Sequence, residues 1–134
     1  MLNRLTDKLD FLGQSLALRS ERQRLIASNI ANADTPGYVA RDMDFARALR
    51  EATGGTTAPG TLSTTSPGHM ALPAGARAEA QLLYATPSQT SLDSNTVDMD
   101  RERAAFADNA LKYEATLRFI NGNVRTTLDA IKGQ

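Results

Sequence analysis

The sequence contains no cysteine and no tryptophan, and aromatic residues make up only 5% of it. Without cysteine the chain has no disulfide, no thiolate nucleophile and no cysteine-based metal site. Its 15 basic and 15 acidic residues balance, so no overall field directs it toward nucleic acid or an anionic membrane. Few aromatics are poor material for the compact core of a 134-residue chain, which suggests that neighbouring chains complete the buried surface.

Long apolar runs are missing as well. No stretch approaches the roughly 20 apolar residues that a membrane-spanning helix needs. Asp7 and Asp10 lie where the apolar region of a secretory signal peptide would be. We therefore expect no direct membrane insertion and no cleaved signal peptide, so that any export of the chain follows a route that needs neither.

Groups that carry out catalysis or bind metals are scarce. His69 is the only histidine, and no cysteine or second histidine accompanies it as a metal ligand. The sequence also lacks a nucleophile elbow, a P-loop and a dinucleotide-binding motif. We predict no enzyme activity, no cofactor, no metal site and no nucleic-acid partner.

Residues 1–33 are predicted to form an N-terminal assembly helix. Their apolar residues recur at alternating steps of three and four, the spacing of one helix face in a coiled coil or bundle. Asn3 is a candidate N-cap. Arg19 and Gln23 interrupt the apolar seam, and either their long side chains cross it to reach solvent or they set the register with a partner helix. The seam residues assigned to an assembly interface are Leu9, Leu12, Leu16, Ile26 and Ile30.

A turn and a short amphipathic segment are predicted for residues 34–52. Pro36 and Gly37 fit the two central positions of a type II turn, in which glycine supplies the positive φ. Phe45 and Leu49 follow, one helical turn apart, which indicates a short helix with one apolar face.

Residues 53–92 differ in composition from both ends of the chain. Glycine, proline, threonine and serine supply 21 of these 40 residues, and Arg77 and Glu79 are the only charged ones. Such a segment buries too little apolar surface to offset the entropy lost on ordering. We predict an irregular middle that is flexible or ordered by partners, with a short helix over residues 74–84 as a further possibility.

Residues 93–134 are predicted to form a C-terminal assembly helix that ends near Lys132. Acidic residues crowd its first turns, where the helix dipole favours them. Gly122 lies inside the helix and costs about 1 kcal/mol relative to alanine, so either a neighbour approaches closely there or the cost is tolerated. The apolar seam again steps by four and three, and its residues assigned to the assembly interface are Phe106, Tyr113, Leu117, Ile120 and Val124.

The sequence therefore predicts an all-α fold in which long N- and C-terminal helices pack as a coiled-coil-like pair. Leu111, Phe119 and Leu128 lie off the seam of the second helix, and a helix with more than one apolar stripe needs more than one neighbour. We expect the isolated chain to be largely unfolded or molten at its ends and to become ordered on incorporation into a larger helical assembly.

Two motifs resemble those of a known family. Residues 25–38, Leu-Ile-Ala-Ser-Asn-Ile-Ala-Asn-Ala-Asp-Thr-Pro-Gly-Tyr, resemble the signature of flagellar rod and hook proteins, and residues 91–100 resemble a narrower motif of the proximal-rod members. That family usually has glycine where this chain has Ser94, so a turn needing positive φ would be strained. The motif residues are Asn29, Asn32, Thr35, Pro36, Gly37, Tyr38, Asp93, Asn95, Val97 and Asp98. Asn29 and Asn32 either bond neighbouring backbone or cap their own helix.

The resemblance implies a structural subunit of the proximal rod of the bacterial flagellar basal body. Such subunits polymerise through their terminal helices into a hollow shaft that crosses the periplasm and transmits torque for motility. The implied partners are copies of the chain, other rod proteins, the adaptor joining the rod to the membrane ring, and the flagellar type III export apparatus.

Three questions stay open at this point. Phe45 and Leu49 resemble a short element read by the export gate, but an ordinary amphipathic turn explains them equally well. The chain is either the proximal-rod protein whose motif residues 91–100 resemble, or a sibling protein of the same family. A cytoplasmic helical adaptor or export chaperone is the alternative from another class.

Overall fold

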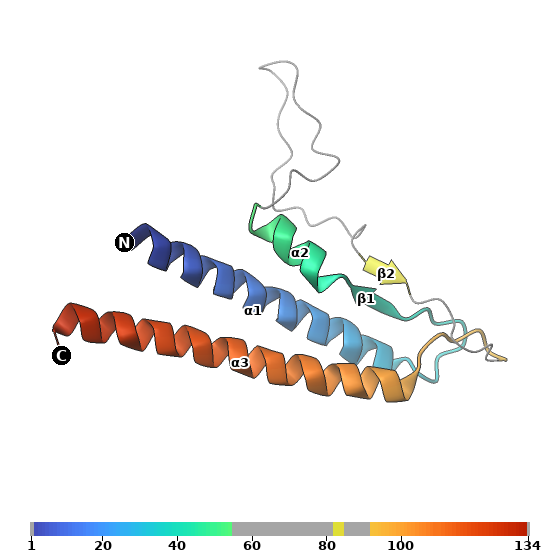
Figure 1. Ribbon diagram of the computed structural model, residues 1–134. Coiled ribbons are helices and arrows are strands. Elements are labelled where there is room, and N and C mark those ends of the chain that lie inside the picture. The colour runs from blue at the N-terminus through green and yellow to red at the C-terminus, as the bar shows by residue number, and fades with distance from the viewer. Residues whose placement is uncertain (1, 55–81, 85–91, 134) are drawn as a thin grey trace, which may run out of the picture.

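The structure, a computed structural model, describes residues 2–54, 82–84 and 92–133. Its elements follow the order α1 (Leu2–Ala31), β1 (Arg41–Met43), α2 (Phe45–Ala52), β2 (Leu82–Tyr84) and α3 (Met99–Lys132). The long helices α1 and α3 lie side by side, and the two chain ends are at the same end of the pair (Figure 1). The predicted all-α fold with a terminal helix pair is confirmed.

The two long helices, α1 and α3, differ in how their ends are capped. Asp98 caps α3, because its carboxylate accepts hydrogen bonds from the backbone N–H groups of Asp100 and Arg101. At the other end Gly133 has a φ of 72° and its N–H donates to Asp129 O, so α3 ends at Lys132, as predicted. The predicted N-cap at Asn3 is wrong: α1 already includes Leu2, and Asn3 therefore lies inside the first turn.

Residues 82–84 form a strand, so the predicted helix over residues 74–84 is wrong at its C-terminal end. β2 pairs with β1 in antiparallel register, with Met43 opposite Leu82 and Arg41 opposite Tyr84. A short apolar run fits a helix or a strand equally well by periodicity, and here the pairing with β1 decides. The other residues of that predicted helix, His69, and most of the predicted irregular middle lie outside the described residues.

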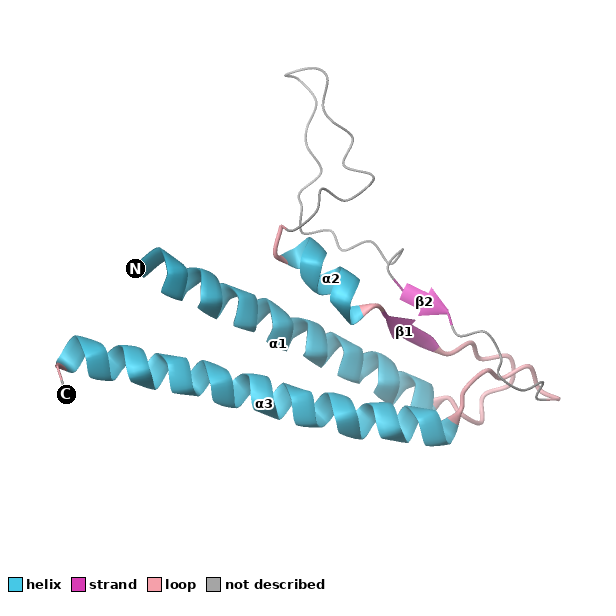
Figure 2. Cartoon of the chain, in the orientation of Figure 1, coloured by secondary structure: helices cyan, strands magenta, loops and turns pink. Residues whose placement is uncertain are grey.

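The short amphipathic helix predicted after the turn is α2. Asp44 caps it by accepting a 3.0 Å hydrogen bond from the N–H of Arg47, and the Arg47 side chain reaches Glu51 one turn later at 3.0 Å. Figure 2 shows α2 and β1 along one side of α1, with α3 along the other side.

The buried core lies where α1, β1 and α2 meet. Leu18, Met43 and Ala48 form its centre, which we call the Leu18 cluster. Leu25, Phe45, Leu49 and Ala52 pack against this centre. The guanidinium of Arg19 lies 4.2 Å from the centre of the Phe45 ring, a cation–π contact.

The line along which α3 meets α1 is polar. Asn109 and Thr116 are the buried residues of α3. The Asn109 amide nitrogen donates to the backbone oxygen of Arg19 at 2.9 Å and to Gln23 Oε1 at 2.6 Å. Because Gln23 bonds a single residue of α3, it fits the interpretation in which it sets the register between the two helices. The Arg19 side chain instead turns toward α2.

Candidate assembly site: a motif junction and an open flank

The two resemblance motifs meet at the end of the helix pair that lies away from the chain ends (Figure 1). We call residues 28–41 and 93–98 together the motif junction. Because more than 50 residues of chain separate its two parts, tertiary contacts rather than local sequence bring them together.

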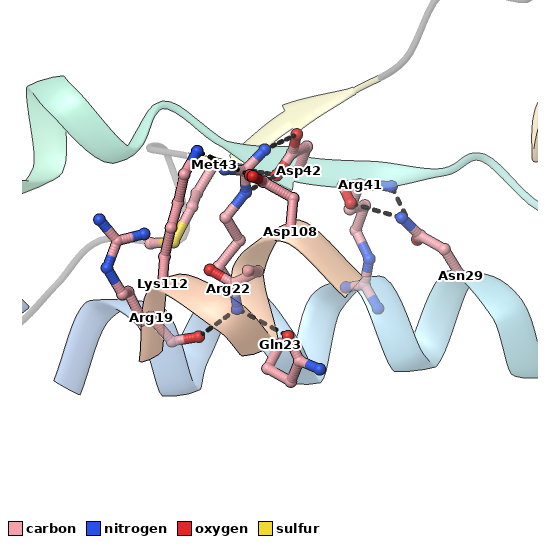
Figure 3. A network of polar contacts seen from close by, with 10 residues as sticks. Arg19, Arg22, Gln23, Asn29, Arg41, Asp42, Met43, Asp108 and Lys112 are labelled. Atoms are coloured by element: carbon pink, nitrogen blue, oxygen red, sulfur yellow. Dashed lines mark hydrogen bonds and ion pairs between the residues drawn. The ribbon is translucent and has the colours of Figure 1, made fainter. Parts of the chain in front are cut away.

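Asn29 is the centre of the first motif and is 1% exposed. Its amide nitrogen donates to Arg41 O at 2.7 Å, and its oxygen accepts from Arg41 N at 3.0 Å, so one side chain pairs both backbone groups of β1's first residue (Figure 3). The Tyr38 hydroxyl also donates to Asn29 Oδ1 at 3.2 Å and lies 3.2 Å from the Ser28 hydroxyl. These bonds fix the angle at which the chain leaves α1 to form β1.

Asn32 behaves differently from Asn29. Its amide nitrogen donates to Ser28 O, one turn back in the same helix, at 2.8 Å, and its side-chain oxygen accepts from the Thr35 hydroxyl at 3.2 Å. The two alternatives raised for this pair of asparagines are therefore both realised. Asn29 bonds the backbone of a neighbouring segment, and Asn32 caps its own helix end.

Asn95 joins the second motif to the end of α1. Its amide nitrogen lies 3.0, 2.9 and 2.8 Å from the backbone oxygens of Asn32, Ala33 and Thr35. Its side-chain oxygen accepts from Val97 N at 2.8 Å. These carbonyls belong to the turn that follows α1, and a residue about 60 positions later in the chain supplies their donor.

Backbone bonds continue the contact between the motifs. Gly37 N donates to Asp93 O at 2.7 Å, and Thr96 N donates to Tyr38 O at 3.0 Å. The hydroxyl oxygen of Thr96 accepts from Ala40 N at 2.8 Å. Gly37 has the positive φ, 72°, that the predicted turn after Pro36 requires.

Ser94 has a φ of 59°, and it is the one non-glycine residue with positive φ among those the structure describes. The turn at this position does need the left-handed conformation, in which a side chain costs about 1–2 kcal/mol that glycine avoids. The strain expected from the sequence is therefore present.

Charged side chains flank the junction. The guanidinium of Arg22 meets both carboxylate oxygens of Asp42 at 3.2 and 3.3 Å and so ties α1 to β1 (Figure 3). The hydrogen bond from Lys112, 2.7 Å long, holds the pKa of Asp108 below its usual range. Burial raises the pKa of Glu102 on α3, and the Asp42 carboxylate adds to the rise, while a hydrogen bond with the Asn29 side chain opposes it.

The predicted interface residues differ in how far the single chain buries them. On α1, Ile26 is buried and Leu9, Leu12, Leu16 and Ile30 are half-buried. On α3, Ile120 is half-buried, but Phe106, Tyr113, Leu117 and Val124 are 37–41% exposed. At 100° per residue these four point roughly 70° away from the polar line through Asn109 and Thr116.

We call this side of the pair, marked by Phe106, Tyr113, Leu117 and Val124, the open flank. A shallow hollow of about 200 Å³ lies on it between the two helices, lined by Ser20 and Gln23 of α1 and by Ala110 and Tyr113 of α3. The opposite side of α1 is occupied by β1 and α2. The open flank therefore contains a groove, and α3 provides its apolar side.

Comparison with known proteins identifies the family. A family model described as "Flagella basal body rod protein" matches residues 9–38, which are most of α1 and the turn. The flagellar basal body rod protein FlgB of Proteus mirabilis (strain HI4320) is 47% identical over 135 residues and 98% of each chain. The chain belongs to the FlgB family of flagellar basal body rod proteins.

Other FlgB proteins match over a similar length. FlgB of Salmonella typhimurium is 46% identical over 140 residues, covering 99% of each chain. FlgB of Cereibacter sphaeroides is 44% identical over 128 residues, covering 96% of each chain. The resemblance read from residues 25–38 and 91–100 is therefore confirmed at the level of the FlgB family.

In this member of the FlgB family, the sequence did not reveal which residues of α3 face α1. Asn109 and Thr116 are seven residues apart, and Glu102 precedes them by another seven, so one polar stripe runs along α3. This seven-residue repeat of polar side chains could have indicated the inner face of α3, but a polar stripe on a helix usually faces solvent. Within the described residues no group of three or more acidic, histidine or cysteine side chains is placed to hold a metal, and no helix is long and apolar enough to cross a membrane.

Removing the Asn29 side chain should cost more stability than removing that of Asn32. Asn29→Ala leaves both buried backbone groups of Arg41 without partners, and we expect the free energy of unfolding to fall by about 1–3 kcal/mol. Asn32→Ala removes a partly exposed cap whose bonds water can replace, and we expect a loss below about 1 kcal/mol. Urea unfolding of the two variants measures both, and equal losses would contradict the central role of Asn29.

Glu102→Gln should stabilise the fold at neutral pH. Because the pKa of Glu102 is raised on folding, its ionised form destabilises the folded state, and this penalty is largest at pH values above its folded-state pKa. The advantage of the variant should shrink as the pH falls through that value toward the ordinary 4.5. Unfolding free energies measured between pH 7 and pH 4 test this, and an advantage that is absent at pH 7 or constant across the range would contradict it.

Proposed function

We propose that this chain is a structural subunit of the proximal rod of the bacterial flagellar basal body, and that neighbouring subunits cover its open flank. One observation carries the proposal. The two fully buried residues of α3, Asn109 and Thr116, are polar, while Phe106, Tyr113, Leu117 and Val124 stay in contact with solvent. Membership in the FlgB family of basal body rod proteins supports the rod as the assembly that these side chains serve.

Covering the open flank offers a favourable free energy to a partner helix. Fully burying a large apolar side chain contributes about 1.5–3 kcal/mol, and the four flank residues keep roughly two fifths of their surface exposed. A helix lying in the groove between α1 and α3 would therefore gain about 2–5 kcal/mol from these residues alone. Repeated along a shaft of many copies, contacts of this size support a stable polymer.

A second neighbour is supported by other apolar residues of α3. Leu111 and Phe119 are 68% and 66% exposed, and neither lies on the open flank. A Cβ added at Gly122 meets nothing within 4 Å of its own chain, so the fold of the single subunit does not require glycine there. Close approach of a neighbouring backbone at Gly122 is part of the proposal.

The proposed role is mechanical. At about 1.5 Å per residue, helices of 30 and 34 residues reach roughly 45 and 51 Å, and several such pairs packed side by side make a stiff hollow shaft. The proposed partners are copies of the chain, other rod proteins and the adaptor to the membrane ring. We propose that the subunit has no catalytic activity and no cofactor.

The alternatives drawn from the sequence receive less support. Relatives that match 96–99% of their length are named as basal body rod proteins, and nothing in the helix pair favours a cytoplasmic adaptor or an export chaperone. A sibling rod protein is disfavoured for the same reason. We further propose that the subunit reaches the periplasm through the flagellar type III export apparatus without a cleaved signal peptide.

A charge placed on the open flank should block assembly without unfolding the subunit. Leu117→Asp changes a side chain that is already 39% exposed, so we expect the isolated chain to lose only about 1–2 kcal/mol of stability. In the assembled rod the carboxylate would be buried without a partner, which a neighbouring subunit cannot tolerate. Cells carrying the variant should make the protein but lose motility and lack it in purified basal bodies.

The matched control is Ala17→Asp, which places the same charge at an exposed position of α1 that lines neither the hollow nor the Leu18 cluster, and cells carrying it should stay motile. Motile cells with Leu117→Asp incorporated into basal bodies would contradict the proposed role of the open flank.

The export element at Phe45 and Leu49 needs a control for folding, because both residues pack against the Leu18 cluster. Phe45→Ala and Leu18→Ala weaken the same cluster, but only the first alters the proposed element. We expect secretion of Phe45→Ala to fall at least severalfold while Leu18→Ala is secreted normally, as measured by the amount of subunit in the culture medium. Equal secretion of the two variants would remove the export interpretation.

A further inference from the structure

We propose that residues 93–98 form a strap that opens and closes on the end of α1 while the Leu18 cluster stays folded. The order of residues 32–40 then depends on a segment that the chain supplies 60 residues later. The contacts between the two segments, and the conformation of Ser94, carry this inference.

Hydrogen bonds join the strap to the segment that follows α1. Asn95 is the one fully buried side chain of the strap, and that side chain is polar. Further hydrogen bonds join backbone groups of Gly37, Tyr38 and Ala40 to Asp93 and Thr96. Water replaces such bonds at a small net cost, whereas opening the Leu18 cluster exposes buried apolar side chains. The strap is therefore the part of this region that opens first.

Strain within the strap acts in the same direction. Ser94 holds a φ of 59° only while the strap is closed, because that conformation lets Asp93 and Asn95 reach the end of α1 together. An open strap relaxes Ser94 to an ordinary φ. The serine thus shifts the equilibrium toward opening, relative to a strap with glycine at this position.

Opening has a local consequence. The carbonyls of Asn32, Ala33 and Thr35 lose the Asn95 amide, and Gly37 N loses its acceptor, so the turn that follows α1 loses the bonds that order it. The paired bonds between Asn29 and Arg41 lie outside the strap and are kept. The N-terminal end of α3 gains freedom to adjust its position against a neighbour. That use rests on the proposed assembly, whereas the opening itself is a property of the single chain.

Amide hydrogen exchange on the full-length chain tests the strap. We expect the N–H groups of Gly37, Ala40 and Thr96 to share one protection factor. That factor should be lower than those at Ile26 and Ala48, which report on α1 and the Leu18 cluster. Exchange of these three amides through one opening event would give them the same protection after correction for their intrinsic rates.

Substitutions within the strap sharpen the test. Ser94→Gly removes the strain and should slow exchange of the three strap amides by roughly fivefold, with no change at Ile26 or Ala48. Ser94→Ala is the matched control, because alanine is strained at the same φ and should leave the rates unchanged. Asn95→Ala should abolish protection of the strap amides and keep that of Ile26 and Ala48.

Three outcomes would overturn the proposal. Equal protection of the strap and the Leu18 cluster would show that both open together. An equal effect of Ser94→Gly on all amides, or no effect, would show that Ser94 does not control local opening. Exchange without protection anywhere in the chain would contradict the requirement that the cluster stays folded while the strap opens.

Discussion

The hydrogen bonds from Asn109 to α1 decide which face of α3 is available to other molecules. A buried amide that bonds Arg19 O and Gln23 favours one rotation of α3 about its axis, because another rotation would break both bonds from the Asn109 nitrogen. With that face turned inward, the apolar stripe of the helix lies on the flank. The surface that we propose for assembly is therefore exposed as a consequence of how the subunit folds.

The two ends of the pair are held by different means. At the motif junction, asparagine side chains bond backbone groups: Asn29 pairs with Arg41, and Asn95 reaches the end of α1. Residues of the two resemblance motifs thus fix the geometry of a chain reversal. At the other end, Leu128 and Ile131 are 48% and 75% exposed, so the single subunit gives those turns little support. Assembly and folding share the same helices.

Much of this architecture was readable in the sequence, and the remainder depended on distant contacts. Steps of three and four residues predicted both long helices, and Gly37 predicted its turn. Periodicity located the apolar stripe of α3 but not the direction in which it points, since a polar stripe with Asn109 takes the inner face. The strand at residues 82–84 depends on pairing with β1, and the contacts of Asn95 join segments 60 residues apart, which no local pattern encodes.

The central claim is that neighbouring subunits bury the open flank, and the accessibility of single cysteines tests it most directly. The sequence has no cysteine, so one introduced in place of Leu117 gives an unambiguous signal, and one in place of the exposed Ala17 of α1 serves as the reference. With a water-soluble thiol reagent, we predict that both positions react in the isolated chain and that only position 117 is strongly protected in purified basal bodies. Equal reactivity of position 117 in the two states would contradict the account.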